Sequence, residues 1–482
     1  MNRKMVFYMF GRIGQIAALL LLLPAVVAII YGEYKQLWAF LITAALAVAA
    51  GTLISLVCRT KNKVIYAKEG FAIVTVAWVC MSVVGALPFT LSGEIPSYID
   101  AIFETVSGFT TTGASILRDV EAMSYSMLFW RSFTHWIGGM GVLVFVMAIV
   151  SNMTDRSIHL MRAEMPGPTV GKLVPRGRDT AKILYLIYIV MTVVQIIMLW
   201  VGDMNLYESI VHTFGTAGTG GFGIKADSIG GYSSYSQMVI AVFMLLFGVN
   251  FNLFYLVIIG RFKSVLKSTE LWTYLGIVAV AVVSITVNIL PLCGGVGDAF
   301  RQAFFQTSSI MTTTGYSTVN FDLWPSFSKG ILMLLMCFGA CAGSTAGGLK
   351  ISRVVILFKL FLGEIRRMLH PRSVSSVKFE GKAVDKQTLD SVAVYFAVYV
   401  FCIIAAFLAI SFEPFGFETN FSAVLATFNN IGPGFGAVGP FGGFADYSGF
   451  SKIIFSFAML LGRLEIFPLI IALSPSTWRK NR

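Results

Sequence analysis

Charged residues are scarce in this chain. Asp, Glu, Lys and Arg make up 12% of its 482 residues, whereas a typical soluble domain has about 25%. Hydrophobic residues make up 56% of the sequence, and the mean hydropathy is +0.79. This composition excludes an ordinary soluble domain and indicates a protein that crosses a membrane several times.

Motifs for cofactors and catalysis are also missing. The six cysteines include no C-x-x-C pair, and no G-x-x-x-x-G-K-[ST] phosphate loop occurs. Gly218–Gly223 and Gly434–Gly439 match G-x-G-x-x-G, but neither has the preceding strand, the following helix and the acid about 20 residues on that a dinucleotide site needs. We therefore expect no enzyme activity and no cofactor held by the chain itself.

Apolar stretches of about 20 residues or more, enough to span a bilayer, occur ten times. They lie at residues 8–31, 37–58, 70–92, 126–151, 181–201, 236–260, 271–291, 330–361, 390–411 and 451–473. The first has no small-residue cleavage site before a polar start, so we interpret it as a retained helix rather than a signal peptide.

The net charge of +12 follows a pattern along these spans. If the N-terminus is inside and the spans alternate, Lys and Arg are about four times as frequent on the inner segments as on the outer ones. Asp and Glu show the opposite bias. This positive-inside pattern predicts a cytoplasmic N-terminus and explains the basic charge without any binding of nucleic acid.

The most informative feature is a segment rich in threonine or glycine that recurs between long spans. It occurs as Thr110–Gly113, Thr219–Gly221, Thr312–Gly315 and Gly432–Gly434. Each copy follows a stretch too short to cross the membrane: Ile102–Phe109, Ile210–Phe214, Phe300–Ile310 and Phe421–Phe428. Irregular backbone at membrane depth is tolerated where it lines a wet cavity, so we expect these segments to re-enter from outside and turn at the loops.

The predicted fold is an all-α polytopic membrane protein with four M1–P–M2 repeats around a pseudo-fourfold pore. It combines ten transmembrane helices with four re-entrant pore helices. The domain boundaries that we predict are 1–65 for an N-terminal transmembrane hairpin and 66–155, 176–265, 268–370 and 386–478 for the four repeats.

A ring of inward carbonyls can replace the hydration shell of a potassium ion, and glycine reaches the backbone angles that such a ring needs. The candidate filter glycines are Gly113, Gly220, Gly315 and Gly434. The complete candidate filter is Thr111, Thr112, Gly113, Thr219, Gly220, Gly221, Thr313, Thr314, Gly315, Gly432, Pro433 and Gly434. Contacts with the ion are predicted at Thr111, Thr112, Gly220, Thr313, Thr314, Gly432 and Pro433. Small residues for close helix packing are the alternative for any single loop.

Two further features fall inside the predicted pore. The eighth span is interrupted by four glycines and three alanines in Gly339–Gly348, which do not make a rigid helix. We interpret Gly339, Gly343, Ser344, Thr345, Gly347 and Gly348 as a flexible gate loop, with a closely packed helix as the alternative.

Arg463 lies within the last span, where a charge is costly. It is predicted to face the cavity as a barrier to cations while Glu465 faces a neighbouring repeat; a salt bridge to Glu364 or another acid is the alternative.

These motifs together resemble the TrkH-type bacterial potassium transporters, a family that includes TrkG, KtrB and plant HKT proteins. The likeness covers essentially the whole chain, and the N-terminal hairpin is similar to that of TrkH. The resemblance implies a homodimer, a glycine in each filter loop for potassium selectivity, a gating loop at Gly339–Gly348 and a pore arginine at Arg463. It also implies a cytosolic, TrkA-like nucleotide-binding ring, for which the basic inner segments 156–182 and 353–386 are a candidate docking surface.

We therefore predict an inner-membrane protein, surrounded by lipid, that takes up potassium, and rubidium in its place, as a substrate ion. A proton- or sodium-coupled symporter of the same fold is the alternative, and the sequence leaves the coupling open. A secondary transporter of organic solutes is a more distant alternative, since such proteins are commonly built from inverted repeats whereas all four repeats here start on the inside.

Overall fold

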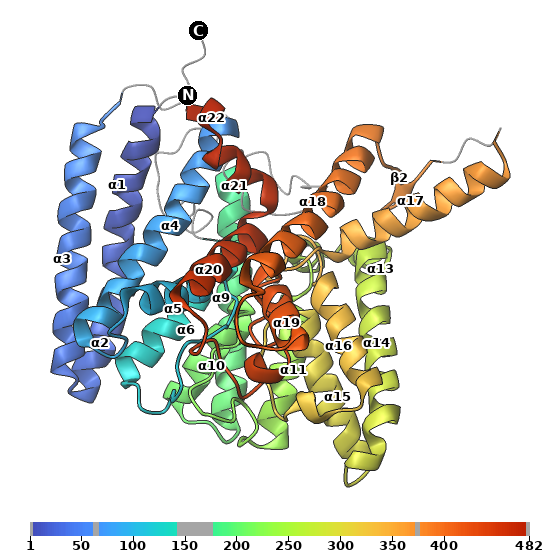
Figure 1. Cartoon of the computed structure of the whole chain (residues 1–482), viewed down its shortest axis with the longest axis horizontal. Helices are drawn as coiled ribbons and strands as arrows, with labels where there is room; N and C mark the ends of the chain where they lie inside the picture. Colours follow the sequence, from blue (N-terminus) through green and yellow to red (C-terminus); the bar gives the residue numbers. More distant parts are fainter. Residues whose placement is uncertain (1–2, 61–66, 142–176, 372–375, 479–482) are drawn as a thin grey trace.

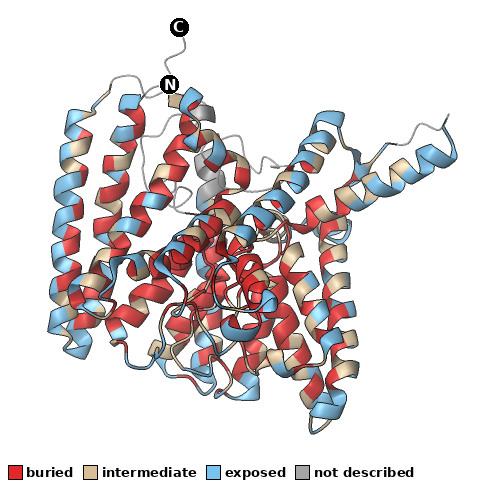
Figure 2. Ribbon diagram, viewed as in Figure 1, coloured by how far each residue is buried: buried red, intermediate tan, exposed pale blue. Residues whose placement is uncertain are grey.

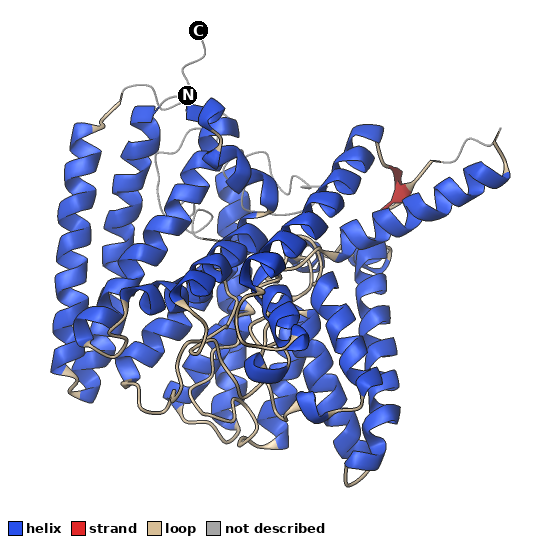
Figure 3. Ribbon diagram, viewed as in Figure 1, coloured by secondary structure: helices blue, strands red, loops and turns tan. Residues whose placement is uncertain are grey.

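The computed structural model describes residues 3–60, 67–141, 177–371 and 376–478. Regular structure in this part is helical apart from one two-stranded hairpin, formed by β1 (Lys378–Phe379) and β2 (Lys382–Ala383). Three predicted segments lie partly outside the described residues: the span 126–151 and the basic segments 156–182 and 353–386. Figure 3 shows helices around the outside and irregular loops meeting in the middle.

Long apolar helices confirm the membrane character that the composition predicts. Six in the described part are long and apolar enough to cross a membrane, or up to eight if two bent pairs each count as one span. The six are the α1–α2 pair (Arg3–Leu20 and Leu22–Tyr31), α3 (Tyr34–Val57), α4 (Ala67–Ser92), α9 (Gly177–Val201), α14 (Thr269–Ile289) and α18 (Lys386–Ile410). The count of ten spans stays a prediction.

The predicted spans 236–260 and 451–473 are not continuous helices. α11 (Ser234–Phe247) meets α12 (Phe251–Ile258) at 91°, and α20 (Gly449–Leu464) meets α21 (Ile466–Leu473) at 115°. At the first bend the side chain of Asn250 caps α12 by accepting a hydrogen bond from the backbone N–H of Asn252. At the second, Glu465 has a φ of 57°. The N-cap Asn250 begins a new helix, and the positive φ of Glu465 ends one, so each interrupts an apolar run.

The predicted span 330–361 is interrupted where its glycines lie. α16 (Ser326–Phe338) ends there, residues 339–350 are irregular, and α17 (Ile351–Leu369) follows. α17 continues eight residues past the predicted end of the span, and Figure 1 shows it projecting sideways from the helical body.

Four shorter helices lead into the recurring loops. They are α5 (Tyr98–Phe109), α10 (Leu206–Gly218), α15 (Val296–Met311) and α19 (Phe417–Phe428). Each is longer than the stretch predicted from the sequence, because its first turn carries polar residues such as Asp100 and Glu208 that apolar counting leaves out. Figure 2 shows buried positions concentrated in the centre of the molecule, where these helices end.

A polar tie recurs at one end of each of the four predicted repeats. The side chain of a serine at the start of the second long helix donates to an acid or amide near the end of the first. The pairs are Ser124 with Glu94, Ser233 with Asp203, Ser328 with Asn288, and Ser448 with Glu413. The ties lie at the starts of α6 (Tyr125–Gly139), α11, α16 and α20. Three of the four partners are carboxylates, which the dipole at a helix N-terminus favours. Each tie joins two long helices of one predicted repeat.

The N-terminal helices pack against the first unit. α1 and α3 approach so closely that a Cβ atom added at Gly11 would lie 2.5 Å from the carbonyl oxygen of Gly51. The carboxylate of Glu33 accepts hydrogen bonds from the backbone N–H groups of Tyr125 and Ser126, at 2.7 and 2.9 Å. The first helices therefore hold the outer end of α6 as well as each other.

The remaining elements are short. They are α13 (Phe262–Leu266), α22 (Pro475–Trp478) and three 3₁₀ turns, Leu290–Leu292, Phe321–Leu323 and Gly436–Val438. Nε of Arg3 donates to the carbonyl oxygen of Trp478 at 3.0 Å, so the first and last described helices meet at one end of the molecule (Figure 1).

Candidate functional site

The four recurring loops adopt one backbone conformation. Each has a left-handed residue followed two positions later by a glycine with positive φ. The left-handed residues are Thr111, Thr219, Thr313 and Asn430, with φ of 56° to 57°, and the glycines are Gly113, Gly221, Gly315 and Gly432, with φ of 75° to 99°. Left-handed angles are uncommon for residues with side chains, so four copies at equivalent positions mark a repeated structure.

The glycines close these loops into a ring. A Cβ atom added at any of the four would lie within 2.7 Å of a carbonyl oxygen of the next loop, and the last loop meets the first. The pairs are Gly113 with Gly220, Gly221 with Thr314, Gly315 with Ile431, and Gly432 with Thr112. The backbones around the ring are therefore so close that only glycine fits at each crossing.

Two of the predicted filter glycines are not the ones that take this backbone conformation. In the second loop Gly221, not Gly220, occupies the position equivalent to Gly113. In the fourth loop the equivalent residue is Gly432, two residues before the predicted Gly434. Gly220-Gly221 and Gly432-Pro433-Gly434 each contain two glycines. Only the backbone angles show which of the two is equivalent to Gly113.

The displaced glycines have other reasons to be small. A Cβ atom at Gly220 would collide with the ring of His135, which lies against the back of the loop. Gly434 lies outside the left-handed region, and its N–H donates to the carbonyl oxygen of Val438 at 2.7 Å. Gly220 nevertheless contributes the ring carbonyl of the second loop.

The fourth loop contains two residues that the sequence prediction missed. Asn430 takes the left-handed position that threonine takes in the other loops, and Ile431 contributes the ring carbonyl. Nδ2 of Asn430 donates to Oγ1 of Thr112 at 2.9 Å, which joins the last loop to the first. Asparagine tolerates left-handed angles better than most residues, so Asn430 was the signal available in the sequence.

A cavity opens on one side of the ring. All four ring glycines line it, together with Pro433. The short helices α5, α10, α15 and α19 end directly before the loops. The C-terminal end of a helix carries partial negative charge, so the ring is an environment that favours a cation.

A buried ion pair braces the segments that follow the first two loops. Nε of Arg131 lies 2.5 Å from Oε1 of Glu104, and both side chains are almost fully buried. Nη1 of Arg131 donates to the carbonyl oxygen of Gly223, and its guanidinium lies 3.6 Å from the centre of the Phe222 ring. Glu104 accepts from the N–H of Ile116 at 2.9 Å. The pair therefore ties together the segments that follow both loops.

The glycine-rich segment predicted as a gate packs directly against the ring. The N–H of Gly347 donates to Oγ1 of Thr313 at 2.7 Å, and a Cβ atom at Gly347 would lie 2.5 Å from the carbonyl oxygen of Asn429. Gly339, Gly343 and Gly348 all have φ between 70° and 76°. A Cβ atom at Gly348 would lie 2.8 Å from the Cα of Gly339. The segment is thus a compact, closely packed loop in contact with the ring.

The other side of this loop is bound to the bend between α11 and α12. The N–H of Cys341 donates to the carbonyl oxygen of Gly248 at 3.1 Å. The N–H of Phe251 donates to the carbonyl oxygen of Gly343, also at 3.1 Å. Oγ1 of Thr345 donates to the carbonyl oxygen of Phe247 at 3.2 Å. The bend missing from the prediction therefore supplies the backbone groups that hold the loop.

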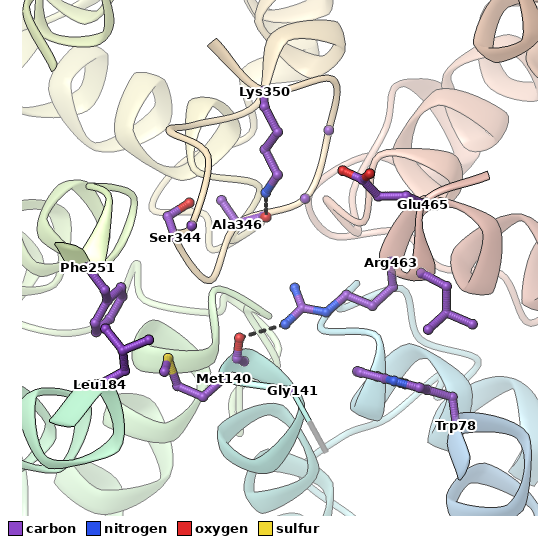
Figure 4. Close-up of a pocket in the computed structure, with 16 residues that line it drawn as sticks. Trp78, Met140, Gly141, Leu184, Phe251, Ser344, Ala346, Lys350, Arg463 and Glu465 are labelled. Atoms are coloured by element: carbon purple, nitrogen blue, oxygen red, sulfur yellow. Dashed lines mark hydrogen bonds between the residues drawn. The ribbon is translucent and has the colours of Figure 1, made fainter. Parts of the chain in front are cut away.

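Arg463 joins the loop to the ring. Its Nη1 donates to the carbonyl oxygen of Thr345 at 2.6 Å and to Oγ1 of Thr111 at 3.2 Å. Its Nη2 donates to the carbonyl oxygens of Gly138 and Gly139, at the end of α6. Figure 4 shows the Arg463 side chain extending into the cavity between these segments.

The cavity around Arg463 is small. Ser344, Lys350, Arg463 and Glu465 are among its lining residues, and it offers about 40 Å³ to water-sized molecules. One water needs roughly 10–15 Å³ on this measure, so the cavity holds only a few waters in this conformation.

Glu465 pairs with α17 rather than with its own helix. Its Oε2 lies 2.7 Å from Nη2 of Arg353, which belongs to the third predicted repeat. Glu364, considered as a partner for Arg463, pairs instead with Arg367 at 2.7 Å. Among the described residues, no cluster of three or more His, Cys, Asp or Glu side chains could hold a metal ion.

Apolar spans, a central ring of loops and a charged, nearly closed cavity beneath it define a membrane transport protein rather than an enzyme. The sequence profile of TrkH, described as a cation transport protein, matches residues 36–480. The chain belongs to the TrkH family of cation transport proteins.

Relatives and a solved structure agree with this assignment. The chain is 36% identical over 467 residues to the Trk system potassium uptake protein TrkH of Salmonella typhimurium, covering 95% of this chain and 96% of the relative. It is 34% identical to the Trk system potassium uptake protein TrkG of Escherichia coli, covering 99% of both. The crystal structure of the potassium transporter TrkH from Vibrio parahaemolyticus matches with a TM-score of 0.90 and 31% identity, over 99% of this chain and 100% of that one.

Proposed function

We propose that this protein takes up potassium across the bacterial inner membrane through the ring of four loops. The observation that carries the proposal is the closure of the ring, in which each glycine faces a carbonyl of the next loop and the fourth loop meets the first. Carbonyl oxygens arranged around one axis are the ligands that replace water around potassium. The relatives named as potassium uptake proteins support the choice of ion.

The ion contacts follow the corrected register. The carbonyls of Thr112, Gly220, Thr314 and Ile431 form the ring that would surround the ion. The hydroxyls of Thr111 and Thr313 instead bind Arg463 and Gly347 on the inner side. Of the predicted ion contacts, we keep Thr112, Gly220 and Thr314 at this level, and we place Gly432 and Pro433 at the outer mouth because both line the outer cavity.

In our proposal the segment 339–348 and Arg463 control passage below the ring. The segment packs directly under Thr313, and the guanidinium of Arg463 spans from Thr111 to Thr345. A fixed positive charge below a cation site raises the barrier to permeation. The small cavity around Arg463 supports the view that this conformation is closed.

The remaining parts of the proposal rest on charge distribution and family resemblance. The excess of Lys and Arg on the inner segments favours a cytoplasmic N-terminus. A homodimer and a TrkA-like nucleotide-binding ring on the inner side are proposed from the resemblance. Coupled symport with protons or sodium is the alternative mechanism for the same pore.

The test is uptake of radioactive rubidium by liposomes that contain the purified protein, at a fixed membrane potential. We expect excess potassium to block uptake and excess sodium to leave it unchanged. If neither ion blocks uptake when the cytosolic ring is present, the proposal is wrong. Dependence of uptake on an imposed proton or sodium gradient would favour the symport alternative.

Gly113→Ser tests the placement of the filter in the same assay. A side chain at Gly113 would meet the carbonyl of Gly220, so we expect the preference for potassium over sodium to fall. Gly297→Ser is the matched control, because nothing lies within 4 Å of a Cβ atom at Gly297. Unchanged selectivity in Gly113→Ser would contradict the assignment of the ring as the filter.

A further inference from the structure

The side of the gate loop that faces away from the ring rests on a buried carboxylate. Glu270 lies at the start of α14 and is 5% exposed. Its Oε1 accepts a hydrogen bond from the N–H of Ala342, in the middle of the loop, at 2.7 Å. Hydrogen bonds to an ionised carboxylate are stronger than those between neutral groups, so this contact holds the loop firmly.

Two further segments lie beside the same carboxylate. The side chain of Asn250, at the bend between α11 and α12, and the backbone of Ser352, in the first turn of α17, lie close to Glu270. Three segments that are far apart in the sequence therefore converge on one side chain. They are the bend that binds the loop, the loop itself and the helix that follows it.

A second carboxylate reaches the same helix end from the β-hairpin. Glu380 lies in the turn between β1 and β2, and its Oε1 accepts from Oγ of Ser268 and from the N–H of Glu270, both at 3.0 Å. The hairpin is also tied to α17, because Nζ of Lys359 donates to the carbonyl oxygen of Lys378 at 2.8 Å. Movement of the hairpin would therefore shift the first turn of α14, which carries Glu270.

We propose that Glu270 is a positioning residue that holds the gate loop closed, and that Glu380 links the hairpin at 378–383 to it. The proposal rests on the proposed function of residues 339–348 as a gate. In this proposal the carboxylate of Glu270 accepts a hydrogen bond from the N–H of Ala342 and so keeps the loop beneath the ring. Neither carboxylate touches the ring, so the ion preference does not depend on them.

The first test is Glu270→Gln in the full-length protein in liposomes. An amide has one acceptor oxygen and no charge, so it holds the N–H of Ala342 less strongly than the carboxylate does. Without the cytosolic ring, we expect rubidium flux to rise at least about fivefold. We expect the potassium-to-sodium ratio to stay that of the parent protein. Glu364→Gln, which removes an exposed acid on α17 paired with Arg367, is the matched control and should change neither quantity.

Cys341 provides a second readout that does not require ion flux. It neighbours Ala342 and is fully buried. In a variant whose only cysteine is Cys341, we expect Glu270→Gln to raise the rate of modification by a water-soluble thiol reagent at least about fivefold, as the loop opens. Glu380→Gln should change flux and modification in the same direction, by less.

Glu270→Asp guards against a folding defect in the first variant. It keeps the charge but shortens the side chain by one carbon, so we expect the same increases. Unchanged flux and unchanged modification in both folded variants would overturn the proposal, as would a fall in selectivity alongside the rise in flux. If the parent protein shows no potassium-selective flux but Cys341 modification still rises, the proposed function fails while the positioning role of Glu270 stands.

Discussion

Substitutions at Gly432 and Gly434 can show which of the two glycines belongs to the filter. The structure favours Gly432, whereas the sequence prediction named Gly434. Gly432 has a φ of 99°, and a Cβ atom there would lie 2.7 Å from the carbonyl oxygen of Thr112. A left-handed conformation costs a residue with a side chain about 1–2 kcal/mol, before the ring backbone moves. If the whole of such a cost falls on the potassium-bound ring, about 1.4 kcal/mol is a factor of ten, so we expect Gly432→Ala to lower the preference for potassium over sodium by up to roughly tenfold.

Gly434→Ala is the matched variant. Gly434 lies outside the left-handed region, and the atoms that its Cβ would meet belong to the side chains of Ser422 and Val438. We therefore expect its selectivity to stay within about twofold of the parent protein, because no ring carbonyl is displaced. Rubidium uptake with graded potassium or sodium as competitor measures both variants. A larger loss in Gly434→Ala than in Gly432→Ala would refute the structural register.

Three other perturbations have defined outcomes. Arg463→Gln should raise rubidium flux several-fold in liposomes, because it removes a fixed positive charge below the ring; flux at or below the parent level would contradict its role as a barrier. Glu104→Gln leaves Arg131 buried beside a neutral partner, and such a change costs about 3–5 kcal/mol. We expect a clearly lower melting temperature, with recovery when Arg131 is also replaced by Met. Burial raises the pKa of Asp203, but hydrogen bonds, mainly from Ser233, outweigh burial and hold this pKa below its usual value. Asp203 therefore stabilises the fold at neutral pH, and its contribution is lost as the pH falls below about 4; the melting temperature of Asp203→Asn should lack this acid-dependent part.

The sequence identified the four loops but not their exact alignment. In the first and third strings the predicted Gly113 and Gly315 are the single glycines, and both have the positive φ that recurs in the four loops. The second and fourth strings contain adjacent or nearly adjacent glycines, and composition cannot choose between them. The choice depends on which residue crosses the neighbouring loop, and that contact joins parts of the chain about a hundred or more residues apart.

The bends were hidden for a different reason. Hydropathy averages over a window, so one Asn250 or one Glu465 in an apolar run hardly changes the mean. Each nevertheless ends a helix, because Asn250 caps the next one and Glu465 takes a left-handed angle and pairs with Arg353. The interruption at 339–350 was predictable, since its many glycines lower helix propensity over a whole segment.

The polar ties at the outer ends could have been found from the sequence. Ser124, Ser233 and Ser448 are each the N-cap residue of a helix, which is a recognised start signal, whereas Ser328 lies in the first turn of α16. The partners Glu94, Asp203, Asn288 and Glu413 lie at the outer ends of the preceding helices. To pair each serine with its partner, one must know which helices are neighbours. The repeated order of features along the sequence would have been enough to indicate this.

A single polypeptide closes the ring, and this has a consequence for how the ring can vary. In a channel assembled from four identical subunits, any substitution appears in all four quarters at once. Here a substitution alters one quarter and leaves three, as the occurrence of Asn430 and Ile431 in the fourth loop illustrates. Each quarter can therefore specialise separately: the third unit carries the loop beneath the ring, and the fourth carries the arginine that binds it.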